Sequence, residues 1–383
     1  MIYFDHNATT PLDPRVLEAM LPYLGRYYGN PSSLCRLGRL SRAAMDRARE
    51  QVAALVSVRP RQVVFTSGAT EASNLALFGL AGRMPRAKLV SGQTEHPSVL
   101  GALSAIASKT GWPMERLPVD ADGRHLDFPE RIFQDEPTLC ALMRANNETG
   151  VIQETRPLGD LARWVGGFLH VDAVQAAGKI PLEFQATGAH TLSISAHKLG
   201  GPKGVGALII EEGLVLDPLF HGGGQESGLR PGTEPVALIV GFGMAAEIAR
   251  HELSLRSERL LALRERLEVG LLAFRDVVIH AQSTFRLPNT VQFSLPGWEG
   301  EALVMALDRA GICVSSGSAC AAGGNQPSPV LTAMGVDEAR ARQAVRVSLG
   351  PENDVDDIQA FLSVLSNLVD TTSSPEVGAG EGR

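Results

Sequence analysis

Cysteine is scarce in this sequence: four residues in 383 are too few for a disulfide framework in a chain of this length. Aromatic residues make up only 5%, so we expect a core built mainly from Ala, Val, Leu and Ile. Long apolar runs are also missing, since no stretch approaches the roughly 18 residues that a membrane-spanning helix requires. Positive charge is not in excess, because the formal net charge is −7. These absences argue against a membrane protein and against a nucleic-acid-binding surface.

Targeting signals are missing from the start of the chain as well. Residues 1–6 have neither the basic segment nor the apolar segment of a secretory signal. They also lack the Arg- and Ser-rich composition of an organelle presequence. We therefore expect a soluble cytoplasmic α/β protein whose partners include no nucleic acid and no membrane.

Short apolar runs alternate with helix-compatible segments over the first 235 residues. Each run has about the length of a strand that is buried on both faces. A short helix is expected after Asp13, with Pro14 in its first turn, and longer helices over 40–56 and 71–80. This alternation predicts a mostly parallel sheet covered by helices. The predicted strands are 63–66, 88–91, 139–143, 168–172, 191–195 and 205–210.

The pattern changes after residue 235, which indicates a second, smaller α+β domain. One or two helices are expected over 236–270, followed by shorter strands and helices. The strands are predicted at 277–280, 290–295 and 344–349, and the helices at 301–310 and 355–368. We therefore predict a large domain over 13–250 and a small domain built from 1–12 and 251–370. Residues 371–383 are rich in Ser, Gly and Glu and are predicted to be a disordered tail.

The strongest local signal is the segment 195–204, in which Lys198 follows an apolar run and precedes a glycine-rich turn. A lysine at the end of a buried strand is partly desolvated, which lowers its pKa and frees the amine as a nucleophile. The alternative is a surface lysine in a tight turn. A nucleotide P-loop is excluded, because the spacing G-x-x-x-x-G-K-[ST] is absent.

Two further segments place polar groups where strands are expected to end. Asp172 follows a buried run, where a carboxylate would pair with a protonated ring nitrogen of a cofactor or would instead cap the next helix. The segment 66–71 reads as a strand, a small-residue turn and a helix start. Its free N–H groups would bind an anion, and Ser67 or Thr70 would cap the helix.

The four cysteines differ in their surroundings. Cys140 and Cys313 lie in apolar runs and are interpreted as small core residues. Cys320 has only Gly, Ala and Ser as neighbours, which predicts an exposed thiol on a flexible segment. Such a thiol is an oxidation liability unless it has a purpose. Cys35 is ambiguous, and we favour a structural role.

Weaker signals complete the set of candidates. His96 follows a strand and starts a helix, so it would face a pocket or serve as an ordinary turn residue. The segment 146–150 has the composition of a turn. Arg346 would grip a carboxylate bidentately or point to solvent. The glycine-dense segment 222–233 is expected to shape a site or an interface.

Taken together, these segments closely resemble the cysteine desulfurases of the NifS/IscS type, group I, in the class V aminotransferase family. Ten segments in the same order carry the resemblance: 5–10, 29–33, 66–71, 95–96, 146–150, 170–175, 195–204, 222–233, 315–320 and 346–350. The resemblance implies a homodimeric fold-type I enzyme that depends on pyridoxal 5'-phosphate. Its large domain would contain a mostly parallel seven-stranded sheet, next to a smaller α+β domain.

The resemblance also implies roles for individual residues. Lys198 would hold pyridoxal phosphate as a Schiff base, Asp172 would pair with its pyridine nitrogen, and Gln175 would bond its phenolic oxygen. His96 would stack on the ring and shuttle protons. Substrate would be oriented by Asn147 and Arg346, with Arg346 taking its carboxylate. The phosphate group would be held by Ala69, Thr70, Ser195 and His197, and by Thr233 from the other subunit.

The reaction implied by the resemblance converts L-cysteine to L-alanine. Lys198 would take the Cα proton, and the thiolate of Cys320 would attack the substrate sulfur and keep it as a persulfide. The sulfur would pass to an acceptor for iron–sulfur cluster or other thio-cofactor assembly, with nitrogen fixation as one setting. Cys320 would then also be a transient ligand of an iron–sulfur cluster shared with a scaffold protein. The segment 321–330 has the longer spacing of the group I enzymes.

Three other functions fit parts of this sequence pattern. A selenocysteine lyase stays open, because relatives often accept both substrates. Simple transamination is disfavoured, since it requires no thiol such as Cys320. A non-catalytic sulfur carrier or scaffold protein is expected to have lost Lys198, Asp172 or Cys320, and all three residues are present here.

Overall fold

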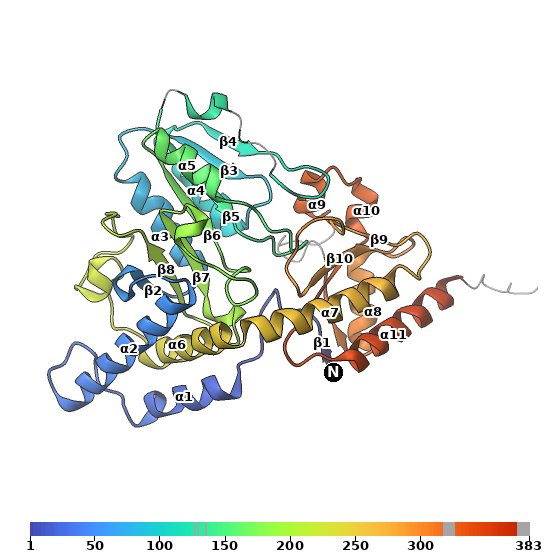
Figure 1. The fold of residues 1–383 in the computed structure, drawn as a ribbon, viewed down its shortest axis with the longest axis horizontal. Helices are drawn as coiled ribbons and strands as arrows, with labels where there is room; N and C mark the ends of the chain where they lie inside the picture. The colour runs from blue at the N-terminus through green and yellow to red at the C-terminus, as the bar shows by residue number, and fades with distance from the viewer. Residues whose placement is uncertain (126–127, 129, 135, 317–325, 374–383) are drawn as a thin grey trace, which may run out of the picture.

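The computed structural model describes residues 1–125, 128, 130–134, 136–316 and 326–373. The larger of its two parts is built around a seven-stranded sheet (Figure 1). The strand order is β2-β8-β7-β6-β5-β3-β4, and only β8 runs antiparallel to its neighbours. This confirms the predicted mostly parallel sheet. The strands are β2 (Val63–Thr66), β3 (Lys88–Gly92), β4 (Met114–Leu117), β5 (Thr138–Met143), β6 (Phe168–Asp172), β7 (Thr191–Ser195) and β8 (Gly206–Ile210).

Helices cover both faces of this sheet, which explains why short apolar runs in the sequence predict most of its strands. Along β5, Leu139 and Ala141 join the hydrophobic cluster on one face, and Cys140 and Leu142 join the cluster on the other. The first face is covered by α3 (Ala69–Ala81) and α4 (Pro97–Thr110). The second is covered by α1 (Pro14–Gly25), α2 (Arg36–Leu55), α5 (Arg156–Trp164) and α6 (Val236–His251).

A smaller sheet lies beside the large one and has its own core. Its four strands are antiparallel, in the order β12-β13-β10-β9. Phe4, Phe293 and Phe361 meet edge to face within this core, so the N-terminal segment is anchored in it. The strands are β9 (Val278–Ile279), β10 (Thr290–Ser294), β12 (Ser315–Ser316) and β13 (Ala344–Ser348). The covering helices are α7 (Leu253–Leu271), α8 (Gly300–Arg309) and α11 (Val355–Ser373).

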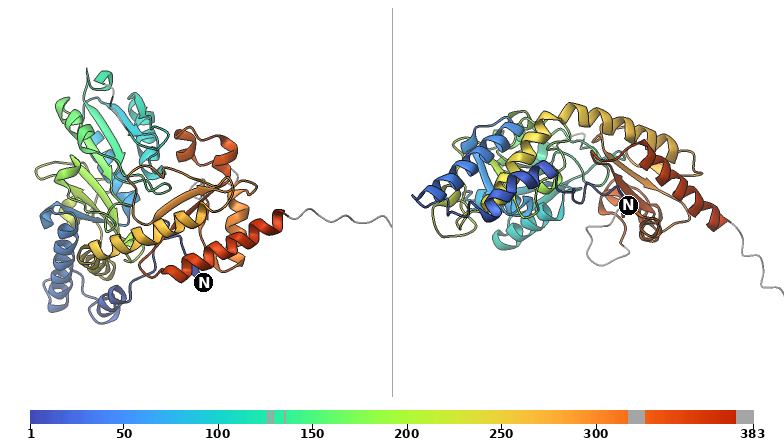
Figure 2. Two further views of the ribbon diagram at one scale, coloured as in Figure 1. Left: turned by 45° about the vertical axis from the view of Figure 1, so that its right-hand side comes forward. Right: turned by 90° about the horizontal axis from the view of Figure 1, so that it is seen from below.

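The two parts are joined by the N-terminal segment and by the helices α6 and α7. In both views of Figure 2, α7 runs from the helices of the large sheet to the small sheet. The predicted boundary at residue 250 lies next to the junction of α6 and α7, and the domain division itself stays a prediction. Remaining short elements are β1 (Ile2–Tyr3), which pairs in parallel with β11 (Ile312–Cys313), α9 (Pro329–Ala333) and α10 (Glu338–Arg342). The 3₁₀ segments are η1 (Pro60–Gln62), η2 (Glu130–Phe133), η3 (Gln185–Thr187), η4 (Ala196–Lys198) and η5 (Gln225–Gly228).

Several local predictions are corrected. Strand β4 was not predicted, because this short edge strand has the charged residues Glu115 and Arg116 at its centre and so lacks an apolar run. The predicted cap of α3 by Ser67 or Thr70 is wrong: the N-cap is Gly68, and the Ser67 amide donates to Glu71 Oε2 at 2.7 Å. Cys313 is half-buried on β11, not a core residue.

The C-terminal prediction is corrected in part. Helix α11 reaches Ser373, so residues 371–373, predicted to belong to the tail, are helical. The remaining predicted tail, 374–383, lies outside the described residues. None of the helices in the described part of the chain is long and apolar enough to cross a membrane.

Candidate active site

A cavity of about 760 Å³ opens at the carboxyl ends of β5, β6 and β7, where ligands bind in α/β sheets. Its wall also includes the start of α3, the N-terminal segment and β13 of the small sheet. The cavity brings together ten of the twelve predicted site residues, from sequence positions up to 277 residues apart. These are Ala69, Thr70, His96, Asn147, Asp172, Gln175, Ser195, His197, Lys198 and Arg346.

Lys198 lies at the end of η4, directly after β7. Its Nζ donates to the backbone carbonyl of Asn7 and, at 2.7 Å, to that of Ala8. The side chain therefore points into the cavity wall formed by the N-terminal segment. The alternative of a surface lysine in a tight turn is excluded by these contacts.

The N-terminal segment also clamps the backbone around Lys198. Thr10 Oγ1 accepts a hydrogen bond from the Gly200 amide (2.9 Å), and the Thr10 amide donates to the His197 carbonyl (3.0 Å). Thr9 Oγ1 lies 3.1 Å from Nδ1 of His197. The N-terminal segment, which begins in the core of the small sheet, thus fixes the backbone of the turn that carries Lys198 at the edge of the large sheet.

Asp172 is a buried carboxylate at the end of β6. Its Oδ1 accepts a hydrogen bond from the Val174 amide at 3.0 Å. Turns, not a helix, follow Asp172, so the predicted alternative of a helix cap is wrong. Burial raises the pKa of Asp172, and the nearby His96 and Lys198 only partly offset this. A cationic ring nitrogen would supply the positive charge that this buried carboxylate needs, so the position fits the predicted role.

His96 is both the N-cap of α4 and a wall of the cavity, so both interpretations of this residue hold. Its Nδ1 accepts from the Ser98 amide at 3.2 Å. Burial lowers the pKa of His96. An accepting Nδ1 and a lowered pKa both indicate a neutral ring, which is the form able to take up a proton.

The opposite end of the cavity offers donors for an anion. Ala69 and Thr70 begin the 13-residue helix α3, whose first N–H groups have no partner within the helix. Ser195 and His197 face them from the end of β7 and from η4. The two sides can approach because Gly206 lies against Gly68: a Cβ at Gly206 would be 2.7 Å from the Gly68 carbonyl carbon. These donors fit a phosphate group.

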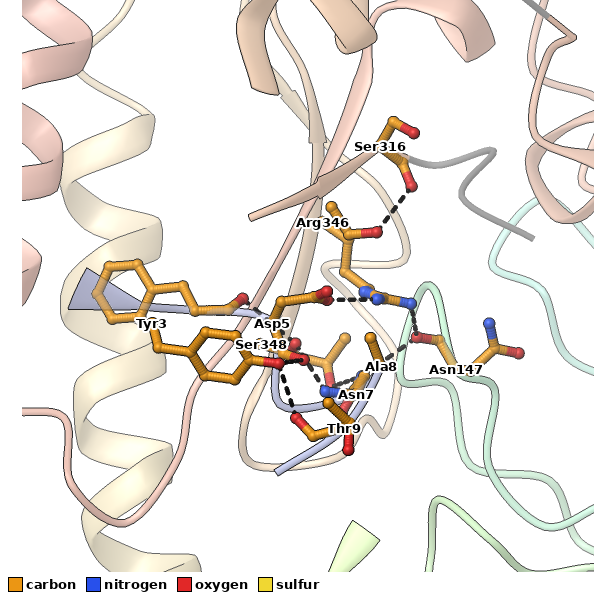
Figure 3. A network of polar contacts seen from close by, with 12 residues as sticks. Tyr3, Asp5, Asn7, Ala8, Thr9, Asn147, Ser316, Arg346 and Ser348 are labelled. Atoms are coloured by element: carbon orange, nitrogen blue, oxygen red, sulfur yellow. Dashed lines mark hydrogen bonds and ion pairs between the residues drawn. The ribbon is translucent and has the colours of Figure 1, made fainter. Parts of the chain in front are cut away.

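Arg346 closes the cavity from β13 and is buried, with 4% of its side chain exposed. Figure 3 shows its guanidinium between Asp5 and Asn147. Nη2 donates to Asp5 Oδ1 at 2.6 Å, and Nη1 donates to the Asn147 carbonyl at 2.9 Å. Within the described part of the chain its Nε has no hydrogen-bond partner. The guanidinium is therefore held in place with donor capacity left for a carboxylate, and the solvent-facing alternative is wrong.

Tyr3 supports the Asp5 end of this network. Its hydroxyl donates to the carbonyls of Asp5 (3.1 Å) and Thr9 (2.9 Å), as Figure 3 shows. Burial, and secondarily Asp5, raises the pKa of Tyr3 to about 12, so the hydroxyl stays a donor at neutral pH. The N-terminal segment is thereby locked across the mouth of the site.

Two of the predicted site residues, Thr233 and Cys320, are not among the described residues that line the cavity. Thr233 is exposed, in the loop after η5, and its contact with another subunit stays a prediction. Cys320 lies outside the described residues. The strand that precedes it in the sequence, β12, pairs with β13 so that Ser315 lies opposite Arg346 and lines the cavity. Among the described residues there is no cluster of three or more His, Cys, Asp or Glu side chains for a metal.

Sequence reasoning missed three residues of the site. Asp5 and Asn7 lie in a segment whose sequence carries only the family resemblance, and contacts of both residues reach 341 residues along the chain. Lys179 is buried and bonds Gln175, four residues before it. An isolated lysine in the stretch Ala176 to Leu182 was the available signal for it, because lysine is almost never fully buried without a partner.

Known proteins with similar sequences and structures were compared with the chain. A sequence profile of the family described as "Aminotransferase class-V" matches residues 2–361. A "Cysteine desulfurase" of Frankia sp. (strain EuIK1) is 43% identical, covering 96% of this chain and 91% of the relative. An "IscS-like cysteine desulfurase" of Mycobacterium tuberculosis is 42% identical, covering 96% of each.

Solved structures agree with this result. One described as "NIFS-LIKE PROTEIN" superposes with a TM-score of 0.90 at 36% identity, covering 97% of this chain and 99% of the other. Another, "SspA in complex with cysteine", has a TM-score of 0.80 at 32% identity, covering 92% of this chain and all of the other (100%). The likeness therefore extends over nearly the whole length of each protein.

Proposed function

Because this chain belongs to the class V aminotransferase family and, within it, to the cysteine desulfurases, we propose that it converts L-cysteine to L-alanine with the help of pyridoxal phosphate. The observation that carries the proposal is the shared cavity of Lys198, Asp172 and Arg346. One residue offers an amine, the second a buried carboxylate and the third a buried guanidinium. These are the groups needed to attach a carbonyl cofactor, to hold its ring and to bind an amino acid.

The residues present fit pyridoxal phosphate at each of its ends. Lys198 would hold it covalently, Asp172 would face its ring nitrogen, and Gln175 would bond its phenolic oxygen. His96 would stack on its ring. When bound, pyridoxal phosphate accepts the electrons that are left on the substrate Cα after its proton departs. The phosphate would be held by Ala69, Thr70, Ser195 and His197, and by Thr233 of a second subunit in a homodimer.

The protein's own groups bind and deprotonate the substrate. Arg346 and Asn147 bind the substrate carboxylate and orient the Cα–H bond. Nζ of Lys198 takes the Cα proton, and the carbonyls of Asn7 and Ala8 hold that nitrogen at the cavity wall. Asp172 keeps a proton on the ring nitrogen, since a buried carboxylate stabilises a cation next to it. His96, with its neutral ring, accepts and returns protons.

Sulfur removal requires a nucleophile, and we assign this role to Cys320. Its thiolate attacks the substrate sulfur, so that an S–S bond forms as the C–S bond breaks and its electron pair stays with the substrate carbon. Protonation of that carbon yields alanine, and the persulfide remains on Cys320. Support comes from Ser315, which lies in the cavity five residues before Cys320. The sulfur would pass, in the cytoplasm, to an acceptor for iron–sulfur cluster assembly, where Cys320 would transiently share a cluster with a scaffold.

The proposal is tested by measuring alanine released from L-cysteine by purified protein in the presence of a reductant. We expect release by the wild type and its loss in Cys320→Ala, with pyridoxal phosphate still bound. Cys35→Ala is the matched control, because Cys35 is a free cysteine that is exposed at the N-cap of α2 and does not line the cavity. Equal release by wild type and Cys320→Ala would show that another group takes the sulfur. No release by the wild type with cofactor bound would overturn the desulfurase assignment.

The carboxylate role of Arg346 makes a separate prediction. Arg346→Lys keeps the charge but loses the planar fork that contacts Asp5 and Asn147. We expect the KM for L-cysteine to rise about 10- to 100-fold, as for the loss of a bidentate charged contact, with a smaller change in kcat. Steady-state kinetics measure this split. Arg340→Lys on the exposed helix α10 is the control, and an unchanged KM in Arg346→Lys would assign the carboxylate to another residue.

A further inference from the structure

Lys179 is a buried lysine whose partners are two amide groups. Its Nζ lies 2.6 Å from Oε1 of Gln175 and 2.7 Å from Oδ1 of Asn7. The charged groups that act on it, Lys198 and Arg346, are both cations. Burying an amine without an opposite charge costs stability, and an apolar side chain would fill the same space more favourably. The position therefore requires an explanation other than packing.

The hydrogen bonds of Lys179 fix the orientation of both amides. An amine that donates to Gln175 needs an oxygen there, so Oε1 faces Lys179 and Nε2 faces away from it. Nε2 donates one N–H to the Asn7 carbonyl at 2.9 Å. Its second N–H is left for the cavity that Gln175 lines. Without Lys179 the Oε1 atom would have no such donor, and the amide would be free to turn its oxygen toward the cavity.

Asn7 carries the same constraint to the substrate side. Its Oδ1 also accepts from Asn289 at 3.2 Å, so its Nδ2 is turned toward the Asn147 carbonyl (3.1 Å) and Thr290 Oγ1 (2.9 Å). The Asn147 carbonyl in turn accepts from Arg346, as Figure 3 shows. The buried amine of Lys179 thus orients two amides. That of Gln175 lies on the cofactor side of the cavity, and that of Asn7 contacts Asn147 on the substrate side.

We propose that Lys179 is a positioning residue that makes Gln175 present an N–H, rather than a carbonyl oxygen, to the phenolic oxygen of pyridoxal phosphate. This inference rests on the proposed function, because it concerns how that cofactor is held. Burial lowers the pKa of Lys179 well below its ordinary value. The positioning survives loss of its charge, since a neutral amine still has two N–H donors for two amide oxygens. The other titratable group next to Lys179 is His6, whose pKa burial lowers to about 4.

The test is a pH titration of the absorbance of bound pyridoxal phosphate in the holoenzyme. An N–H donor stabilises the anionic ring oxygen and lowers the pKa of the proton that this oxygen shares with the lysine nitrogen. We expect Lys179→Met to move the midpoint to higher pH by about half a unit or more. Lys179→Arg, which keeps donors, should return it toward the wild-type value. Lys88→Met, which removes another half-buried lysine far from the site, should leave it unchanged.

A double mutant separates positioning through Gln175 from a direct effect of the amine. In a Gln175→Ala background, the Lys179→Met change should move the midpoint no further, because the group it acts through is gone. An equal shift in both backgrounds, or no shift in the single variant, would overturn the inference. If Lys179→Met does not fold, Lys179→Leu, which also has no donor, replaces it with the same expected shift. A wild type that neither binds pyridoxal phosphate nor releases alanine would overturn the proposed function instead.

Discussion

Replacing Lys198 with alanine is expected to lower the rate of alanine release from L-cysteine by at least about a thousandfold. The variant loses both the covalent attachment of the cofactor and the base for the Cα proton. Alanine has no donor that could replace the Nζ contacts to the carbonyls of Asn7 and Ala8. Rate measurements with saturating added pyridoxal phosphate separate the loss of the base from simple loss of cofactor.

Attachment is measured independently of activity. After reduction with borohydride, mass spectrometry should find pyridoxal phosphate on the Lys198 peptide of the wild type and none on the variant. Lys109→Ala, at an exposed lysine near the end of α4, should behave like the wild type. Cofactor covalently bound to another lysine, together with retained activity in Lys198→Ala, would contradict the assignment.

Asp172→Asn is expected to lower kcat by at least about a hundredfold, which corresponds to roughly 3 kcal/mol of lost transition-state stabilisation. The amide keeps the shape of the side chain and its acceptor for the Val174 amide, but it carries no negative charge to hold a proton on the ring nitrogen. Stopped-flow and steady-state rates measure the change. Asp160→Asn at an exposed position of α5 is the matched control, and a near-normal kcat in Asp172→Asn would remove the carboxylate from the mechanism.

The same substitution has an opposite effect on the stability of the protein without cofactor. Because burial raises the pKa of Asp172 in the folded state, the folded chain binds this proton more tightly than the unfolded chain. The wild type therefore loses stability as pH rises from the unfolded value of about 4 toward the raised folded value. Urea unfolding should find cofactor-free Asp172→Asn more stable than the wild type near pH 7, with the difference vanishing below about pH 4.

Much of the large sheet could be predicted because its strands are buried on both faces. Apolar runs mark β5 and β8, and in β6 and β7 apolar residues are interleaved with buried polar ones. Strand β4 at the edge of the sheet is half exposed and carries Glu115 and Arg116, so its pairing with β3 has no apolar signature. Helix ends were predictable where a side chain caps them, as Asp13 does for α1 by accepting from the Arg15 amide.

The candidate site could be predicted where chemistry and strand ends coincide. Asp172 ends β6 and Lys198 ends the η4 turn that follows β7, and the carboxyl ends of neighbouring parallel strands meet at one edge of a sheet. The second layer of contacts could not be predicted in this way. The partners of Arg346 and Lys179, which are Asp5 and Asn7, belong to a segment that reaches the cavity only because Phe4 is buried in the small-sheet core. Nothing in the local pattern around Lys179 indicates those contacts.

The most direct test of the account is the fate of sulfur in a single reaction cycle. Holoenzyme is mixed with one equivalent of L-cysteine per chain and no other thiol, because excess L-cysteine would itself reduce the persulfide, and alanine and protein-bound labile sulfur are measured together. The account predicts about one alanine and one labile sulfur atom per chain, with the added sulfur on the Cys320 peptide by mass spectrometry. Alanine released without an equal amount of protein-bound sulfur, or sulfur bound at Cys35 or Cys313 in place of Cys320, would contradict it.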